Sequence, residues 1–145
     1  MRFSEAQKQK VVSTSSATTV GRVDGFVVDP VTSRVVALKL KKTPGDADLL
    51  AWSALTSFGT DAVTVPDEGV FTSADGEFAE LADSDHDVMG KLVLTRTGVE
   101  LGTVEDVEFD TTDGTVRTVI TGRTEIPGAA MTGLGTYALM VRPPS

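Results

Sequence analysis

The group of titratable side chains most typical of a functional site lies at residues 83–87, in the sequence DSDHD. Acids at alternate positions resemble the start of a calcium-binding loop, whose carboxylate oxygens bind Ca²⁺. The rest of that pattern is missing, because Val88 stands where the loop needs glycine and Leu94 stands where it needs a bidentate acid. His86 is the single histidine and there is no cysteine, so ligands for a transition metal are lacking. We therefore expect no metal and a solvated acidic segment, with a cation site as the alternative.

Nucleophilic catalysis finds no better support. A serine nucleophile needs a base oriented by a third group, and the only imidazole, His86, lies in the acidic segment. No pair of carboxylates is placed by the sequence in an apolar environment that would raise one pKa. Residues 133–135 (GLG) lack the preceding strand and following helix that let glycines cradle phosphate. The sequence therefore predicts a protein that is not an enzyme and binds no cofactor.

The elements around these residues form an internal repeat. Residues 21–40 (GRVDGFVVDPVTSRVVALKL) align without a gap with residues 102–121 (GTVEDVEFDTTDGTVRTVIT). In each copy a glycine enters a strand, apolar residues follow at strand spacing, an aspartate opens a turn, and a second apolar strand returns. This pattern predicts a β-hairpin in each copy, with an aspartate that caps its own turn.

Two further strands accompany each hairpin. An opening strand is expected at residues 10–12 and again at 91–93, and a glycine-led strand at 59–66 and again at 135–143. The second glycine-led strand follows its hairpin more closely, so the second copy is the shorter one. We expect six residues to have structural roles at the starts of strands and turns: Gly21, Asp29, Gly59, Gly102, Asp110 and Gly135.

The repeated pattern of glycine, valine, an apolar-aspartate pair, a turn and an apolar strand resembles the PRC-barrel family of small β-barrels. The resemblance covers most of the chain and implies an all-β fold with two small PRC-type barrels in tandem, packed on each other, with short helical turns. We expect the first repeat at residues 1–70, an acidic linker at 71–87 that includes a short helix at 71–82, and the second repeat at 88–145. Units of this size bury marginal cores, so we expect them to share an interface.

Bulk properties narrow the class of protein. The chain has 145 residues, 40% of them hydrophobic, and carries a formal net charge of −8. It has no apolar run near the roughly 20 residues that a membrane-spanning helix needs, and its first ten residues lack the apolar core of a signal peptide. We therefore expect a cytoplasmic protein.

Charge is unevenly distributed along the chain. Residues 1–42 hold eight basic residues against three acidic ones, whereas the remainder is strongly acidic. In the strand at residues 35–42, alternation places Lys39 and Lys41 on one face, flanked by Arg34 and Lys42. This basic face is either a solvated strand surface that discourages aggregation or a binding patch.

The two copies differ most after the hairpin. Residues 48–55 carry the only tryptophan, Trp52, and predict a short helical turn capped by Asp48. Trp52 is expected to cover a barrel end or to fill the space between the barrels. Residues 128–135 are small and predict a mobile loop.

The resemblance implies a non-enzymatic adaptor, since family members act in reaction-centre assembly and at the end of a ribosome maturation factor. The expected partner is a protein, with a homodimer as an alternative. A ribosome- or RNA-associated role is a further alternative, although the net charge opposes nucleic-acid binding. A small-molecule site between the barrels, near Trp52 and residues 128–135, is another. The expected partner-binding residues are Arg34, Lys39, Lys41, Lys42, Trp52, Asp106 and Glu108.

Overall fold

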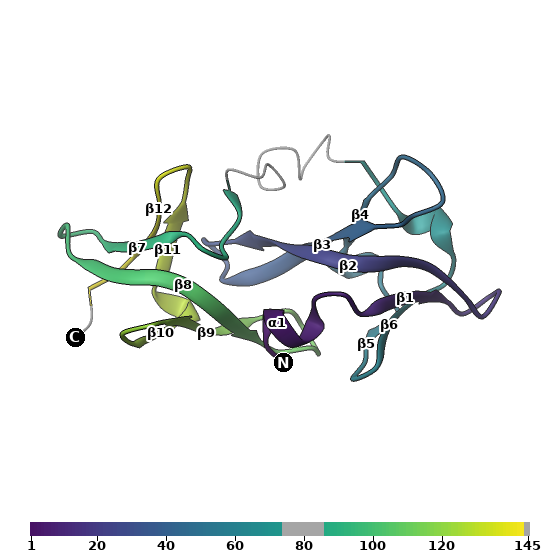
Figure 1. Cartoon of the computed structure of the whole chain (residues 1–145), viewed down its shortest axis with the longest axis horizontal. Helices are drawn as coiled ribbons and strands as arrows, with labels where there is room; N and C mark the ends of the chain where they lie inside the picture. Colours follow the sequence, from purple (N-terminus) through teal and green to yellow (C-terminus); the bar gives the residue numbers. More distant parts are fainter. Residues whose placement is uncertain (74–85, 144–145) are drawn as a thin grey trace.

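The computed structural model describes residues 1–73 and 86–143, which fold mainly into two six-stranded sheets (Figure 1). The first sheet contains β1 (Lys10–Ser13), β2 (Thr18–Asp29), β3 (Arg34–Lys41), β4 (Leu49–Ala51), β5 (Ser57–Phe58) and β6 (Ala62–Val65). The second contains β7 (Leu92–Thr95), β8 (Glu100–Phe109), β9 (Val116–Thr121), β10 (Glu125–Pro127), β11 (Met131–Leu134) and β12 (Ala138–Val141). The short helical segments are α1 (Phe3–Ala6), η1 (Trp52–Ala54), η2 (Glu68–Val70) and η5 (Gly128–Ala130).

The two sheets have the same topology. Their strand orders are β4-β3-β2-β1-β6-β5 and β10-β9-β8-β7-β12-β11. In each, four consecutive strands pair antiparallel, and the chain then returns so that β6 or β12 lies parallel to the opening strand. The predicted all-β tandem fold is confirmed. One detail of the predicted repeat alignment is different in the structure. Val11 pairs with Gly21, whereas Val93, not Leu92, pairs with the equivalent Gly102. The opening strands are therefore offset by one residue relative to the alignment of the hairpins.

One local prediction is confirmed in part and another is wrong. The helical turn expected at residues 48–55 is confined to η1, because Leu49 and Leu50 pair with β3 as a buried strand. The expected mobile loop at residues 128–135 instead forms η5 and β11, which pairs with β12. In both segments, tertiary pairing outweighs the local sequence preference.

The predicted helix at residues 71–82 falls largely on residues 74–85, which lie outside the described part of the chain. Its first residue, Phe71, follows η2 in extended conformation, and Thr72 forms a β-bridge with Leu49. The acidic cluster at residues 83–87 is described only from His86 onward.

The two hairpin turns meet at a local pseudo-twofold axis. The Val35 N–H donates to the Gly114 carbonyl oxygen at 2.8 Å, and the Val116 N–H donates to the Ser33 carbonyl oxygen at 2.8 Å. The alignment of the two hairpins relates Val35 to Val116 and Ser33 to Gly114. Each repeat therefore donates an equivalent hydrogen bond to the turn of the other. Arg34 and Thr115, also equivalent, form the β-bridge between them. The repeats are thus joined through backbone groups at symmetric positions.

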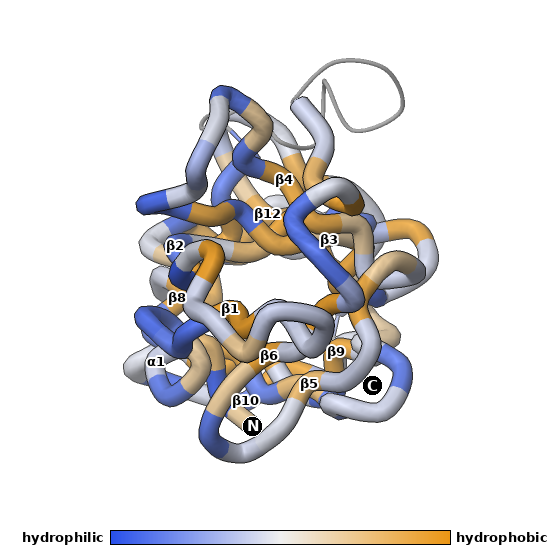
Figure 2. Tube along the Cα trace, turned by 90° about the vertical axis from the view of Figure 1, so that its right-hand side faces the viewer, coloured by the Kyte–Doolittle hydropathy of each residue, from blue (hydrophilic) through white to orange (hydrophobic). Residues whose placement is uncertain are grey.

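Aromatic side chains fill the junction of the two sheets. Phe3 of α1 stacks on Phe26 with ring centroids 3.9 Å apart and meets Phe109 of the second sheet edge-on at 5.4 Å. Trp52 stacks on Phe58 at 5.6 Å and also meets Phe109 edge-on at 6.2 Å. Figure 2 shows hydrophobic residues on the strands of both sheets and hydrophilic residues at the turns. The buried core is therefore shared, as expected for units too small to bury enough apolar surface alone.

Within residues 1–73 and 86–143, no helix is long and apolar enough to cross a membrane.

Candidate functional site

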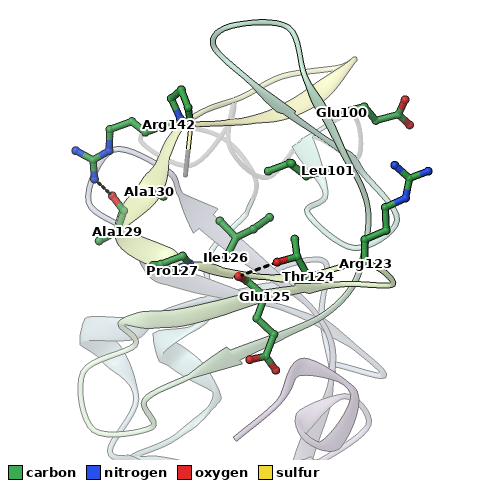
Figure 3. A pocket seen from close by; sticks show the side chains of 11 residues that line it. Glu100, Leu101, Arg123, Thr124, Glu125, Ile126, Pro127, Ala129, Ala130 and Arg142 are labelled. Atoms are coloured by element: carbon green, nitrogen blue, oxygen red, sulfur yellow. Dashed lines mark hydrogen bonds between the residues drawn. The ribbon is translucent and has the colours of Figure 1, made fainter. Parts of the chain in front are cut away.

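A cavity of about 590 Å³ opens beside β10, at the outer edge of the second sheet (Figure 3). Its apolar lining consists of Leu101, Ile126, Pro127, Ala129, Ala130 and Pro143, and its polar lining consists of Glu100, Arg123, Thr124, Glu125 and Arg142. We call this cavity and the adjoining edge of β10 the β10 groove.

The floor of the β10 groove is set by strand pairing. Ile126 lies opposite Val119 of β9, and its side chain is 5% exposed. The buried Thr121 hydroxyl donates to the Leu101 carbonyl oxygen at 3.0 Å and accepts from the Thr124 N–H at 3.1 Å. This hydroxyl holds the start of β8 against the turn into β10, so the two sides of the groove are fixed relative to each other.

The rim of the β10 groove carries charges of both signs. Arg142 donates through its backbone N–H to the Ala130 carbonyl oxygen at 2.8 Å and through its guanidinium to the Ala129 carbonyl oxygen. Exposed Glu100, Arg123 and Glu125 also lie on the rim. An apolar interior with an exposed polar rim is typical of a binding site.

The backbone of β10 is open on the groove side. The Thr121 N–H donates to the Thr124 carbonyl oxygen at 2.9 Å, so alternation along an antiparallel ladder turns the N–H and C=O of Glu125 away from β9. Within the described part of the chain, the only partner of these two groups is the Thr124 hydroxyl, 3.5 Å from the Glu125 carbonyl oxygen. The edge can therefore accept another strand.

Most of the predicted basic face is engaged within the chain. Arg34 lies 3.9 Å from Asp113, Lys39 lies 2.6 Å from Asp87, and Lys41 lies 3.8 Å from Asp24. The Lys39 side chain is 20% exposed, which leaves little of it for a partner. Lys42 is exposed just beyond the end of β3. Partner binding by these residues stays a prediction.

The remaining predicted site residues lie at the junction of the sheets. Trp52 fills space between the two repeats, as the second of its two interpretations predicted. Asp106 accepts hydrogen bonds from the Ser4 hydroxyl and from the Ser4 N–H at 3.2 Å, which ties α1 to β8. Glu108 is half-buried on the same strand, where its backbone forms an antiparallel β-bridge with Arg2. This set therefore does not form one surface with Lys41 and Lys42, which lie at the other end of β3 from the junction.

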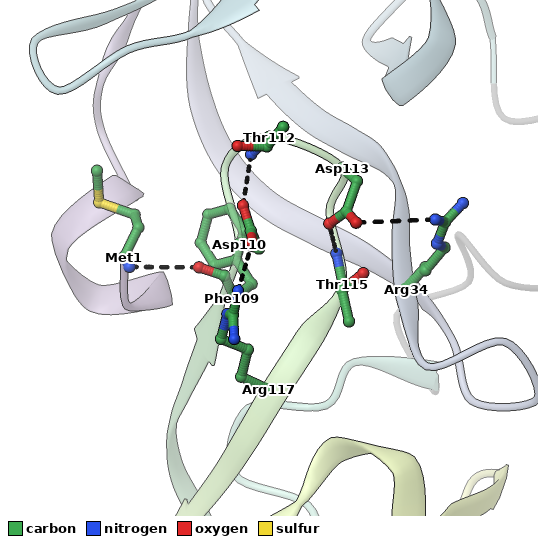
Figure 4. A network of polar contacts seen from close by, with 8 residues as sticks. All are labelled: Met1, Arg34, Phe109, Asp110, Thr112, Asp113, Thr115 and Arg117. Atoms are coloured by element: carbon green, nitrogen blue, oxygen red, sulfur yellow. Dashed lines mark hydrogen bonds and ion pairs between the residues drawn. The ribbon is translucent and has the colours of Figure 1, made fainter.

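The hairpin turns match their sequence interpretation. Asp29 accepts from the Val31 N–H at 2.9 Å, and Asp110 accepts from the Thr112 N–H at 2.8 Å. In the second turn, the Thr112 N–H and then the Arg117 guanidinium lower the pKa of Asp110 (Figure 4). These aspartates stabilise turns that meet at the pseudo-twofold axis, which is a structural role.

The predicted structural glycines are not equivalent. Gly102 has a φ of +104°, a conformation that favours glycine. An added side chain would come within 3.2 Å of Thr43 at Gly21 and within 3.0 Å of the Ala62 carbonyl oxygen at Gly59. At Gly135 it would meet nothing within 4 Å. Of the two equivalent glycines Gly59 and Gly135, only Gly59 therefore lacks room for a side chain.

Metal binding has no geometric support in the described ranges. No group of three or more histidine or acidic side chains there is arranged to hold an ion. Residues 83–85 of the acidic cluster lie outside these ranges.

Sequence reasoning missed the β10 groove. Residues 129 and 130 belong to the segment that was expected to adjoin a small-molecule site, but the groove lies at the outer edge of the second sheet and Trp52 does not line it. The one signal in the sequence was the unequal length of the two copies after the hairpin. That difference gave no indication of which edge would be open.

The comparisons with known proteins agree with the fold. The PRC-barrel domain model matches residues 81–132, which include β7 to β10 and η5. No curated protein matches the chain. The matched residues supply most of the second sheet, and the first sheet repeats its strand order. The second repeat is therefore similar in sequence to a PRC-barrel domain.

Proposed function

We propose that this chain is a non-enzymatic protein–protein interaction module that binds its partner through the β10 groove. The observation that carries this proposal is an apolar cavity of about 590 Å³ beside an open strand edge. The match of residues 81–132 to the PRC-barrel domain, a family of interaction modules, supports the same class of function.

The chemistry of the groove favours a protein ligand. Its volume also falls in the range of small-molecule pockets, which are roughly 300 to 1,000 Å³. A small molecule would use the cavity, but it would leave the outward N–H and C=O of Glu125 unused. A polypeptide can use the cavity and the backbone edge together.

The alternatives are less well supported. The net charge of −8 opposes binding to a phosphate backbone. Self-association through β10 of a second copy would bring identical Glu125 side chains close together across the interface, which is unfavourable.

Affinity capture from cells of the source organism, with the native chain and two variants, tests the proposal. Ala130→Trp places a large side chain in the groove from a half-buried position, whereas Val31→Trp adds the same side chain at a turn residue that is 81% exposed. We expect Ala130→Trp to reduce capture of the partner at least tenfold and Val31→Trp to leave it unchanged. Equal capture by the native chain and Ala130→Trp would contradict binding in the β10 groove, provided that both variants melt within a few degrees of the native chain.

A further inference from the structure

The first sheet shows what covers the edge that the second sheet leaves open. In the first sheet, β4 occupies the edge position that β10 occupies in the second. The Leu49 N–H donates to the Thr72 carbonyl oxygen at 2.8 Å, and the Thr72 N–H donates to the Leu49 carbonyl oxygen at 2.8 Å. Residues 71–72 thus pair antiparallel with the edge of β4.

This pairing also places an aromatic side chain against the sheet. With Thr72 opposite Leu49, the antiparallel register puts Phe71 opposite Leu50 and on the same face of the sheet. Phe71 is 8% exposed, Leu50 is fully buried, and both belong to the same core cluster. The covering segment therefore contributes main-chain hydrogen bonds and one buried ring.

Because β4 and β10 occupy equivalent positions in the two sheets, the same mode of pairing can be expected at the β10 groove. This equivalence relates Leu49 to Glu125 and Leu50 to Ile126, the residue whose side chain forms the groove floor. Leu49 turns its N–H and C=O to the edge, as Glu125 does. The described residues place a cavity, and no segment, at the position that corresponds to Phe71.

We propose that the β10 groove binds an extended peptide segment of a partner protein, which pairs antiparallel with Glu125 and places an aromatic side chain over Ile126. This inference rests on the proposed function and adds the chemistry of the ligand. The expected segment resembles residues 70–72 (VFT), with an aliphatic residue, a phenylalanine and a small hydroxyl residue. The main-chain bonds supply affinity and the cavity supplies the preference for an aromatic ring.

A synthetic peptide with capped ends and the sequence of residues 66–73 (PDEGVFTS) is the probe. It is titrated into the ¹⁵N-labelled full chain and followed by amide chemical shifts, with a Phe71→Ala version of the peptide as control. We expect shifts at Glu125, Ile126 and Ala130, and binding at least tenfold weaker for the control peptide.

Variants of the chain test the strand pairing itself. Glu125→Pro removes the N–H that would bond to the peptide and breaks no bond to β9, because that N–H faces outward. We expect it to weaken peptide binding about tenfold, whereas Glu125→Ala, which keeps the N–H, changes binding less than threefold. Ala130→Trp, which fills the cavity without altering the edge, provides a second variant and should abolish the shifts.

Three outcomes would overturn the inference. They are no shift at the groove with 2 mM peptide, shifts confined to residues 49–54 of the first repeat, and equal binding by the phenylalanine and alanine peptides. If a partner captured from cells is lost in Ala130→Trp while the peptide fails, the groove function stands and the strand-pairing mode is wrong. If capture survives Ala130→Trp, the proposed function itself is wrong.

Discussion

Trp52 and Gly128 occupy equivalent positions in the two repeats, at the start of η1 and η5. One has the largest side chain and the other has none. Trp52 reaches across the pseudo-twofold axis to Gly114, where an added side chain would come within 3.2 Å of the indole. At the equivalent contact, the Ser33 hydroxyl donates to the Gly128 carbonyl oxygen at 2.8 Å. The backbone bonds at the axis are symmetric, whereas the side chains are not. A large residue on one side therefore requires a small one on the other.

The same contrast explains the two hairpin turns. Ser33 and Gly114 are equivalent, and both have positive φ, at 56° and 80°. Ser33 is accommodated because it faces Gly128. A side chain at Gly114 would lie 2.8 Å from the Val35 carbonyl oxygen and would also meet Trp52. The glycine in the second turn is thus required by tryptophan in the first repeat as well as by its own backbone.

The largest expected effect comes from Gly128→Ala. The added methyl group would lie 1.9 Å from the Val116 carbonyl oxygen, so the backbone of β9 or η5 must move. We expect the free energy of unfolding, measured by urea denaturation, to fall by about 3 kcal/mol. Gly135→Ala is the matched control, because a methyl group there meets nothing within 4 Å, and its effect should be about 0.5 kcal/mol or less. Equal effects at the two glycines would contradict the close approach of η5 to β9.

A smaller effect is expected from exchanging the turn residues. Gly114→Ser copies the first turn into the second and should cost about 2 kcal/mol, because the side chain meets the Val35 carbonyl and the Trp52 ring. Ser33→Gly loses one hydrogen bond but relieves a positive φ, so its net cost should be below about 1 kcal/mol. Urea unfolding of both variants measures the difference. Equal costs would mean that the asymmetry at the junction has no energetic consequence.

The hairpins were predictable from the sequence because their signals are local. Asp29 and Asp110 bond to N–H groups two residues further on, so a sequence window of a few residues contains the whole interaction. The expectation of a tandem all-β fold came from the family resemblance, whereas the strand order was not predicted. The hydrogen bonds that join the two turns could not be predicted from local sequence, because the carbonyl groups of Ser33 and Gly114 accept from N–H groups of the other repeat.

The candidate site was harder to predict for the same reason. Alternation correctly identified Lys39 as a side chain outside the core, but its partner Asp87 lies 48 residues away in sequence. The groove floor at Ile126 has an apolar pattern that any buried strand would share. What makes it a groove is the open edge of β10, and the only guide to that edge is the covering segment at Phe71 in the other repeat.

The smallest expected effect concerns Asp106, whose equivalent in the first repeat is Gly25, so that only the second sheet has this carboxylate. Burial raises the pKa of Asp106, but hydrogen bonds from the Ser4 hydroxyl, the Ser4 N–H and the Val107 N–H, together with the charge of Arg2, lower it overall. A carboxyl group with a lowered folded-state pKa stabilises the fold above its unfolded value of about 3.9, and this stabilisation is lost as pH falls through the folded-state pKa.

Asp106→Asn should therefore make stability less dependent on pH in the acid range. Urea unfolding at pH 6 and pH 3 provides the measurement, and the loss of stability between these values should be smaller in Asp106→Asn than in the native chain. Ser4→Ala should reduce the loss in the same direction, because the Ser4 hydroxyl is the first of the groups that lower the pKa. An unchanged pH dependence in both variants would mean that the tie between α1 and β8 contributes nothing to acid stability. The docking of α1 on the second sheet would then depend on the packing of Phe3 against Phe109 and on the hydrogen bonds between Met1 and Phe109.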